Sequence, residues 1–149
     1  MKLAWIVVNG PAHLREKARN RLEVIADTYL SVNAPIQHAL PELLAQRTSI
    51  QSQVMSRVKG NLAVLDSQLS AVPSIRRLRV EAGWNAVLRV PATKSDEELA
   101  IELIETAGVV LHPGHFYDFS QDGFLVISLI TPQNDFREGI VALLKVPDG

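Results

Sequence analysis

Residues 123–144 read GFLVISLITPQNDFREGIVALL, and two different periodicities meet within this stretch. Gly123 to Ile130 is an apolar run rich in β-branched residues, which predicts a strand. Thr131 and Pro132 then predict the start of a helix, because proline suits the first helical turn. Inward-facing positions of this helix recur at helical spacing: Ile140, Leu143 and Leu144. The stretch therefore predicts a strand followed at once by an amphipathic helix.

A hairpin and a second helix are predicted upstream of this stretch. Arg77 to Val80 and Trp84 to Val90 have strand composition on either side of the turn residues 81–83. Ser95 and Glu98 have the spacing of a capping box, which predicts a helix that runs to about Thr106. The basic stretch within this region alternates with apolar residues, which is typical of a strand with one solvated face.

A further strand and a loop are predicted between this helix and Gly123. Val109 to Leu111 has strand composition, and residues 112–119 (HPGHFYDF) have turn composition. Together these segments predict that residues 73–149 form a C-terminal small α+β domain. We expect its helices to pack on a mainly antiparallel sheet.

The first half of the chain has a different organisation. One apolar stripe predicts a long helix from about Thr48, formed by Val54, Val58, Leu62, Leu65 and Leu69. A helix is expected after Pro11 and a shorter one near Pro35, which Pro41 must kink or restart. Leu3 to Val8 is apolar on both faces and predicts a strand buried in a parallel sheet, which needs neighbouring strands. Residues 1–72 are therefore predicted to be the remnant of a larger domain (strand, helix and connector helix).

Composition limits the kinds of partner. The 149 residues contain 15 Lys plus Arg and 16 Asp plus Glu, a net charge of −1. This balance gives no electrostatic reason to expect a nucleic acid or an anionic membrane as partner. There is no cysteine, which excludes disulfides and thiolate metal sites. No apolar run reaches the roughly 20 residues of a membrane span, and we expect a soluble, cytoplasmic protein.

No motif by itself names a reaction. His112 and His115 flank Pro113-Gly114, with Asp118 as the nearest further metal ligand, but the turn separates the imidazoles and we expect no metal site. Asp96, Glu97 and Glu98 crowd a helix start, where carboxylates favour the helix dipole, so they are read as a cap. The chain has no Gly-x-Ser-x-Gly elbow and no glycine-rich phosphate loop.

The sequences of these segments and their order along the chain resemble those of a known protein family. MKLAWIVVNGP, LREKARNRLE and YLSVNAPIQHAL resemble the end of the large domain of fold-type I, pyridoxal-phosphate-dependent class I and II aminotransferases. VEAGWNAVLRVP, AGVVLHPGHFYDF and GFLVISLITPQNDFREGIVALL resemble the small domain that follows. The resemblance covers essentially the whole chain. It implies an α/β fold of which this chain is a C-terminal fragment.

The resemblance also implies a cofactor and a place for it. The parent protein would use pyridoxal 5'-phosphate, and the Schiff-base lysine would lie before Met1, so no catalytic residue and no covalently bound cofactor are expected in this chain. Lys2 stands where many members have an arginine that contacts the cofactor phosphate. Lysine can neutralise that phosphate as a point charge, although without a bidentate fork.

Three further positions are implied to line the substrate pocket: Asn33, His115 and Val126. Val126 stands where the final strand usually carries the arginine that clamps the substrate carboxylate, so ordinary α-amino-acid recognition is in doubt. His115, or Arg89 at the end of the preceding strand, could supply another donor. Ser31 and Asn33 belong to a segment that reaches toward the partner subunit in such dimers. Asn33 is equally explained as a helix N-cap.

The resemblance thus predicts amino-group transfer between an amino donor and a keto acid or aldehyde in the parent, with this chain inactive alone. A homodimer or higher homo-oligomer is expected. Two alternatives remain open at this point, an aminotransferase-like effector domain of a transcription regulator and a non-catalytic binding or dimerisation module.

Overall fold

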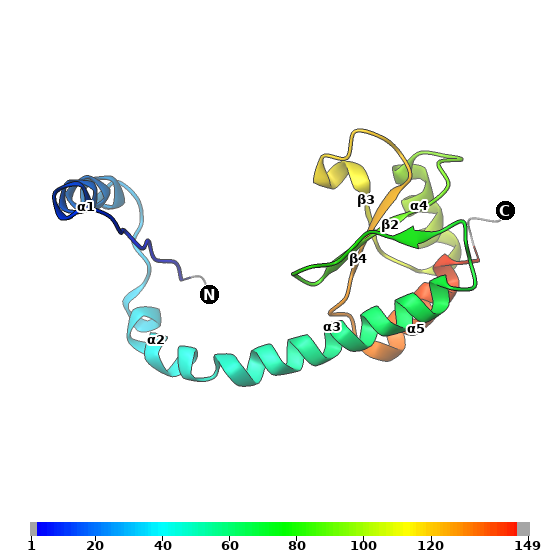
Figure 1. The fold of residues 1–149 in the computed structure, drawn as a ribbon, viewed down its shortest axis with the longest axis horizontal. Coiled ribbons are helices and arrows are strands. Elements are labelled where there is room, and N and C mark those ends of the chain that lie inside the picture. Colours follow the sequence, from blue (N-terminus) through cyan, green and yellow to red (C-terminus); the bar gives the residue numbers. More distant parts are fainter. Residues whose placement is uncertain (1–2, 146–149) are drawn as a thin grey trace. The chain divides into compact units, whose positions relative to one another are not determined.

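The structure, a computed structural model, describes residues 3–145 and divides into two compact units between Ser49 and Ile50. Figure 1 shows the order of elements.

The first unit is helical and has little core of its own. It contains α1 (Ala12–Asp27), α2 (Ala34–Ala45) and the start of α3 (Arg47–Leu69). The side chain of Asn33 caps α2, because its Oδ1 accepts a hydrogen bond from the Ile36 N–H at 3.1 Å. Ile36 is the only buried residue among those of this unit that the structure describes. Helix formation here follows the predicted pattern, but apart from Ile36 the apolar positions of α1 and α2 are exposed or only half-buried.

The predicted strand at Leu3–Val8 is not formed. Residues 3–9 have neither helical nor strand structure, and Trp5, Ile6 and Val7 are exposed. A strand exists only through hydrogen bonds to a neighbour, and no described residue pairs with this segment. The helix does not restart at Pro41, because α2 runs through this residue and the break before α3 falls at Gln46. The other expectation, a kink at Pro41, stays a prediction.

The second unit contains a four-stranded antiparallel sheet of order β1-β2-β4-β3. Its strands are β1 (Arg76–Arg77), β2 (Asn85–Arg89), β3 (His112–Pro113) and β4 (Phe124–Ser128). The antiparallel sheet and the strand at β4 confirm the predicted fold class.

The third strand lies later in the sequence than predicted. Helix α4 (Asp96–Ala107) ends at Gly108, which has a left-handed backbone conformation. The Gly108 N–H donates to the Ile104 carbonyl at 3.1 Å, as in the αL C-cap motif, and the Val109 N–H donates to the Leu103 carbonyl at 3.1 Å. Val109 is thereby still tied to the helix end, and pairing with β4 begins only at His112. The expectation of a strand at Val109–Leu111 was wrong for this reason.

Three helices cover one face of the sheet. α3, α4 and α5 (Gln133–Leu143) share one apolar core with alternate residues of the strands. The residues on this side of β2 and β4, including the residue that follows each strand, are Ala86, Leu88, Val90, Leu125, Ile127 and Leu129. Among the described residues of this unit, no long helix covers the opposite face, to which Val87 and Val126 belong, and we call it the open sheet face. The short 3₁₀ helix η1 (Gly114–Tyr117) follows β3 and contacts β4.

A buried amide joins α3 to the sheet. Asn61 is fully buried, and its Nδ2 donates to the carbonyls of Leu129 (2.9 Å) and Thr131 (2.8 Å). This fixes the second half of α3 to the corner between β4 and α5. The predicted domain boundary at 72/73 concerns the larger fold and stays a prediction.

Within residues 3–145 no helix is both long enough and apolar enough to cross a membrane.

Candidate functional site: the open sheet face

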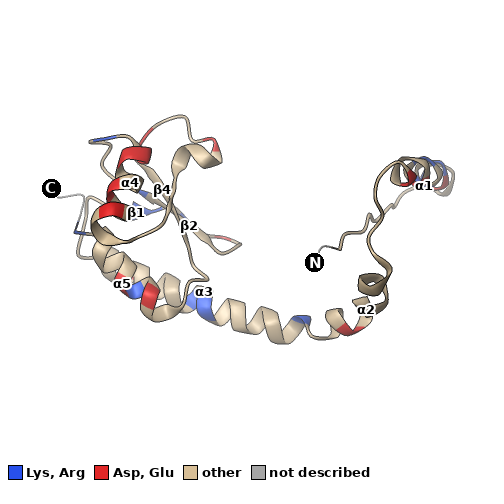
Figure 2. Cartoon of the chain, turned by 180° about the vertical axis from the view of Figure 1, so that it is seen from behind, with Lys and Arg blue, Asp and Glu red and all other residues tan. Residues whose placement is uncertain are grey.

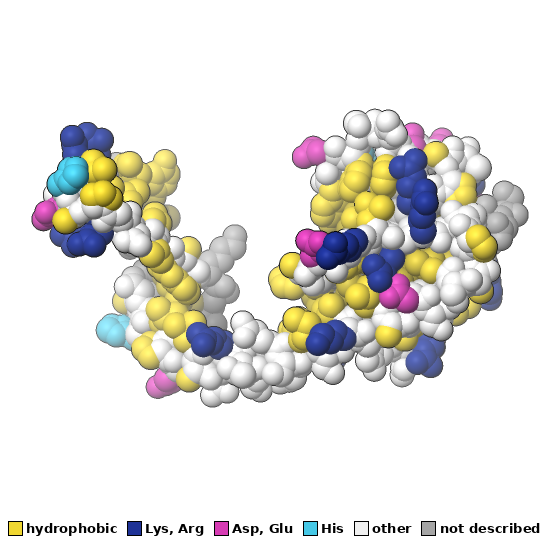
Figure 3. All heavy atoms as spheres, in the orientation of Figure 1, with side chains coloured by type: hydrophobic (Ala, Val, Ile, Leu, Met, Phe, Trp, Pro, Cys, Tyr) yellow, Lys and Arg dark blue, Asp and Glu magenta, His cyan; other side chains and the backbone are white. Residues whose placement is uncertain are grey.

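The strand register arranges the side chains of the open sheet face in rows. Val126 of β4 lies directly between Val87 of β2 and His112 of β3. The Leu78 N–H donates to the Val87 carbonyl at 2.8 Å, which extends this row toward β1. The neighbouring row holds Arg76, Arg89 and Phe124. The two rows place apolar groups beside cationic ones, and Figure 3 shows a hydrophobic patch next to Lys and Arg side chains on this unit.

Val126 lies on the open sheet face but is buried within this unit. Only 4% of its surface is exposed, although it belongs to the open face rather than to the core beneath the helices. A valine here offers no hydrogen bond to a carboxylate. Its assignment to a substrate pocket stays a prediction.

His112, rather than His115, is the histidine next to Val126. Its Nδ1 shares a hydrogen bond of 2.8 Å with the hydroxyl of Tyr117. His115 lies on η1 and is exposed, with its ring edge against Phe116. If the strand had been predicted at residues 112–113, the alternation of side chains along a strand would have identified His112 as the neighbour of Val126.

A buried carboxylate holds this region together. Asp96 is 3% exposed and accepts hydrogen bonds from the backbone N–H groups of Gly123 (2.6 Å), Phe124 (3.1 Å) and Gly114 (3.3 Å). It thus fixes the start of η1 to the start of β4. The sequence pointed to Asp96 only as part of a helix cap, because its three partners are distant in sequence.

The cap itself is made by Ser95 and Glu98. The Ser95 hydroxyl accepts from the Glu98 N–H, and the Glu98 carboxylate accepts from the Ser95 N–H at 3.0 Å. This backbone hydrogen bond is the main reason that the pKa of Glu98 is lowered. Figure 2 shows the acidic residues along α4.

An ion pair holds β1 on the helical side. The Arg77 guanidinium donates to the Asp66 carboxylate of α3 through Nε (2.5 Å) and Nη2 (2.9 Å). These hydrogen bonds lower the pKa of Asp66 and raise that of Arg77. Because alternate residues of a strand face opposite ways, Arg76 faces the open side.

Three predicted positions lie elsewhere. Lys2 lies outside the described residues. Asn33 and Ser31 belong to the first unit, where both are exposed and where Asn33 acts as the N-cap of α2. The predicted role of Ser31 and Asn33 at a partner subunit stays a prediction.

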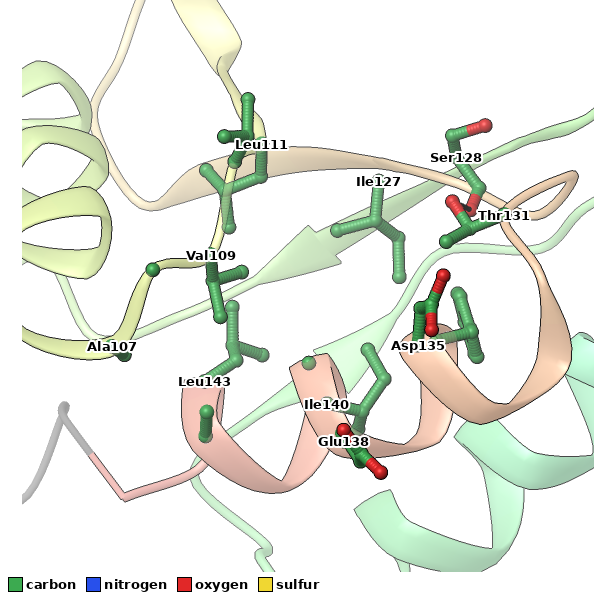
Figure 4. Close-up of a pocket in the computed structure, with 15 residues that line it drawn as sticks. Ala107, Val109, Leu111, Ile127, Ser128, Thr131, Asp135, Glu138, Ile140 and Leu143 are labelled. Atoms are coloured by element: carbon green, nitrogen blue, oxygen red, sulfur yellow. Dashed lines mark hydrogen bonds between the residues drawn. The ribbon is translucent and has the colours of Figure 1, made fainter.

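A pocket of about 530 Å³ lies on the helix-covered side of the sheet, between α5, β4 and residues 107–111 (Figure 4). Figure 4 shows Ile127, Ile140 and Leu143 among its apolar lining, with the carboxylates of Asp135 and Glu138 on α5. Its lining includes no Lys, Arg or His and only Ser128 and Thr131 as hydroxyl groups. This composition does not suit an anionic ligand.

The chemistry of the open sheet face is that of a binding surface. It carries two guanidinium groups and an imidazole, and its strands carry no lysine, so this face offers donors for an anion and no amine for a Schiff base. Among them, no three His, Asp or Glu side chains come together in a way that could hold a metal ion.

Comparison with known proteins identifies the fold. No protein-family model matches the chain. The chain is 24% identical over 148 residues to the glutamate-pyruvate aminotransferase AlaA of Haemophilus influenzae, a match that covers 95% of this chain and 36% of that protein.

Solved structures agree with this likeness. A PLP-dependent aminotransferase from Streptococcus suis superposes with a TM-score of 0.73 at 18% identity, covering 90% of this chain and 34% of that one. The α-aminoadipate aminotransferase LysN from Thermus thermophilus gives 0.70 at 19% identity, covering 91% and 36%. The chain therefore has the fold of a C-terminal portion of the PLP-dependent aminotransferases, and it spans about a third of the length of these relatives.

Proposed function

We propose that this chain is the C-terminal portion of a pyridoxal-phosphate-dependent aminotransferase. The protein of which it forms part would transfer an amino group between an amino donor and a keto acid or aldehyde. The observation that carries the proposal is the likeness to aminotransferases along nearly the whole chain, in sequence to AlaA and in fold to LysN. When bound, the cofactor would supply the electron sink for this chemistry.

In this proposal the chain supplies a wall of the site and no covalent chemistry. A lysine outside this chain would hold the cofactor, as the resemblance to these aminotransferases implies. Lys2 would neutralise the cofactor phosphate, and Val126 would leave the substrate carboxylate without its usual arginine. His115 and Asn33 would contribute further pocket contacts, with Asn33 reaching a partner subunit in a homodimer. The protein is expected to be cytoplasmic.

The geometry around Val126 supports one refinement of this proposal. His112 is the cross-strand neighbour of Val126 and is oriented by Tyr117. It is therefore a better placed donor than His115 for a group that approaches position 126.

The test compares this chain with the complete translation product of its gene. Each is incubated with pyridoxal phosphate, reduced with borohydride and analysed by mass spectrometry for a modified lysine. We expect one stoichiometric modified lysine in the complete product, together with amino transfer from amino acids to pyruvate or 2-oxoglutarate. The 149-residue chain alone should show neither.

A stoichiometric modified lysine within the 149 residues, with an amino-acid-dependent spectral change, would contradict the proposal. So would a complete product that binds the cofactor but transfers no amino group from any member of a broad panel of donors.

A further inference from the structure

Two arginines face each other on the open sheet face. Arg76 of β1 and Arg89 of β2 are direct partners in the antiparallel ladder, and both are exposed. Both belong to the face opposite the helices, because their sequence neighbours Ile75 and Leu88 are in the core. Like charges directly opposite each other destabilise a strand pair. This arrangement is relieved when an anion lies between the two guanidinium groups.

The described residues supply no such anion. Neither Arg76 nor Arg89 has a carboxylate at ion-pair distance among residues 3–145. The arginines that follow Arg76 are different, since Arg77 pairs with Asp66 and Arg79 with Glu81. The two guanidinium groups on the open face therefore keep their hydrogen-bond donors free.

Arg89 is held in position by an aromatic stack. Its Cζ lies 4.8 Å from the centroid of the Phe124 ring, and Phe124 stacks on Phe119 at 4.4 Å between centroids. The Phe124 backbone is anchored in turn by the buried carboxylate of Asp96. This cation–π contact is not a hydrogen bond, so the N–H groups of Arg89 remain available to a planar anion.

An apolar row lies next to the two cations. Leu78 and Val87 are two residues further along their strands, which is roughly 7 Å at the rise of a strand. Leu78 is 39% exposed and so offers apolar surface to a ligand. A molecule with an anionic end and a short apolar body would match both rows at once.

We propose that Arg76 and Arg89 bind the carboxylate of a small molecule whose apolar chain lies over Leu78 and Val87. A carboxylate suits this site because a guanidinium binds it through two parallel N–H···O bonds. Arg89 is also the residue offered above as a substitute donor for the substrate carboxylate, but this inference does not rest on the proposed amino transfer, because the binding needs neither the cofactor nor any residue outside this chain.

The test measures binding of 4-phenylbutyrate, butyrate and acetate to the full 149-residue chain at ionic strength held constant with chloride. Isothermal titration and the arginine Nε–H signals in NMR give the dissociation constants. We expect saturable binding that strengthens with the apolar chain. Arg76→Gln and Arg89→Gln should each weaken it about tenfold or more, as expected for loss of a charge-assisted hydrogen bond.

Arg137→Gln is the matched control, since Arg137 is an exposed arginine of the same unit on α5, and it should leave binding unchanged. Phe124→Leu keeps both charges but removes the stack, and should weaken binding less than Arg89→Gln does. Absence of saturable binding, equal weakening by Arg137→Gln, or tighter binding of inorganic phosphate than of any carboxylate would overturn the proposal. Amino transfer by the complete gene product has no bearing on these outcomes.

Discussion

Replacement of Gly114 by alanine should destabilise the second unit, whereas the same change at Gly139 should stabilise it. A Cβ at Gly114 would lie 2.7 Å from the Cβ of Phe124, 2.9 Å from the Phe124 carbonyl oxygen and 2.8 Å from the Asp96 Oδ2. These atoms belong to a strand and to a buried carboxylate with three hydrogen bonds, so they cannot move aside independently. A Cβ at Gly139, within α5, would meet no atom within 4 Å.

The magnitudes follow from these two environments. Forcing an extra methyl group into a packed site typically costs about 1–3 kcal/mol. Replacing glycine by alanine inside a helix with free space gains roughly 0.5–1 kcal/mol. For an unfolding slope of about 2 kcal/mol per molar urea, a loss of about 2 kcal/mol lowers the urea midpoint by about 1 M. The urea midpoint of Gly114→Ala should therefore be lower than that of the wild type, and the midpoint of Gly139→Ala should be higher.

The assay is urea unfolding followed by tryptophan fluorescence in a Trp5→Phe background. Trp84 then reports on the second unit, since it lines a pocket with Val54 and Arg57 of α3. The reasoning is refuted if Gly114→Ala unfolds at the same or a higher urea concentration than the parent protein. It is also refuted if Gly139→Ala lowers the midpoint as much as Gly114→Ala does.

Three further predictions concern polar contacts. Asp96→Asn should lower the free energy of unfolding in urea by about 2–4 kcal/mol, because the new NH₂ group would face the Gly114 N–H and the remaining hydrogen bonds would no longer be made to a charged group. An unchanged urea midpoint would contradict this. Asp66→Asn should cost no more than about 1 kcal/mol, since the pair with Arg77 is partly exposed. The folded-state pKa of Asp66 is lowered by its hydrogen bonds with Arg77. The stability that the pair contributes is therefore present above the ordinary pKa of about 3.9 and is lost as pH falls through the folded-state pKa. The urea midpoints of Asp66→Asn and the parent protein should therefore become equal in acid. Ser95→Ala should cost about 1 kcal/mol through loss of the N-cap, a cost that Ser95→Thr should largely avoid.

Local sequence signals predicted most of the second unit. The capping box at Ser95 and Glu98, the apolar run at 123–130 and the apolar stripe from Val54 to Leu69 each depend on residues that are close in sequence. Each therefore carries its own evidence for a helix or a strand. The resemblance of these ordered segments to aminotransferases also predicted the fold that the comparisons show.

Features that depend on contacts distant in sequence could not be predicted in this way. The hydrogen bond from the Val109 N–H to the Leu103 carbonyl delays the start of β3. As a result the histidine beside Val126 is His112 and not the predicted His115. The facing of Arg76 and Arg89 requires the strand register, which propensity does not supply. The strand expected at Leu3–Val8 depends on partners that the described residues do not contain.

The division of the chain into two units has a consequence for its cooperativity. The second unit shares one large core, whereas only Ile36 is buried among the described residues of the first. Helices of 16 and 12 residues, the lengths of α1 and α2, are marginal in water without tertiary packing. On heating this chain alone, they should lose ellipticity gradually, before the second unit melts in a sharp transition. Melting curves recorded by far-ultraviolet ellipticity and by Trp84 emission should therefore not superimpose, and no single melting temperature would describe the chain.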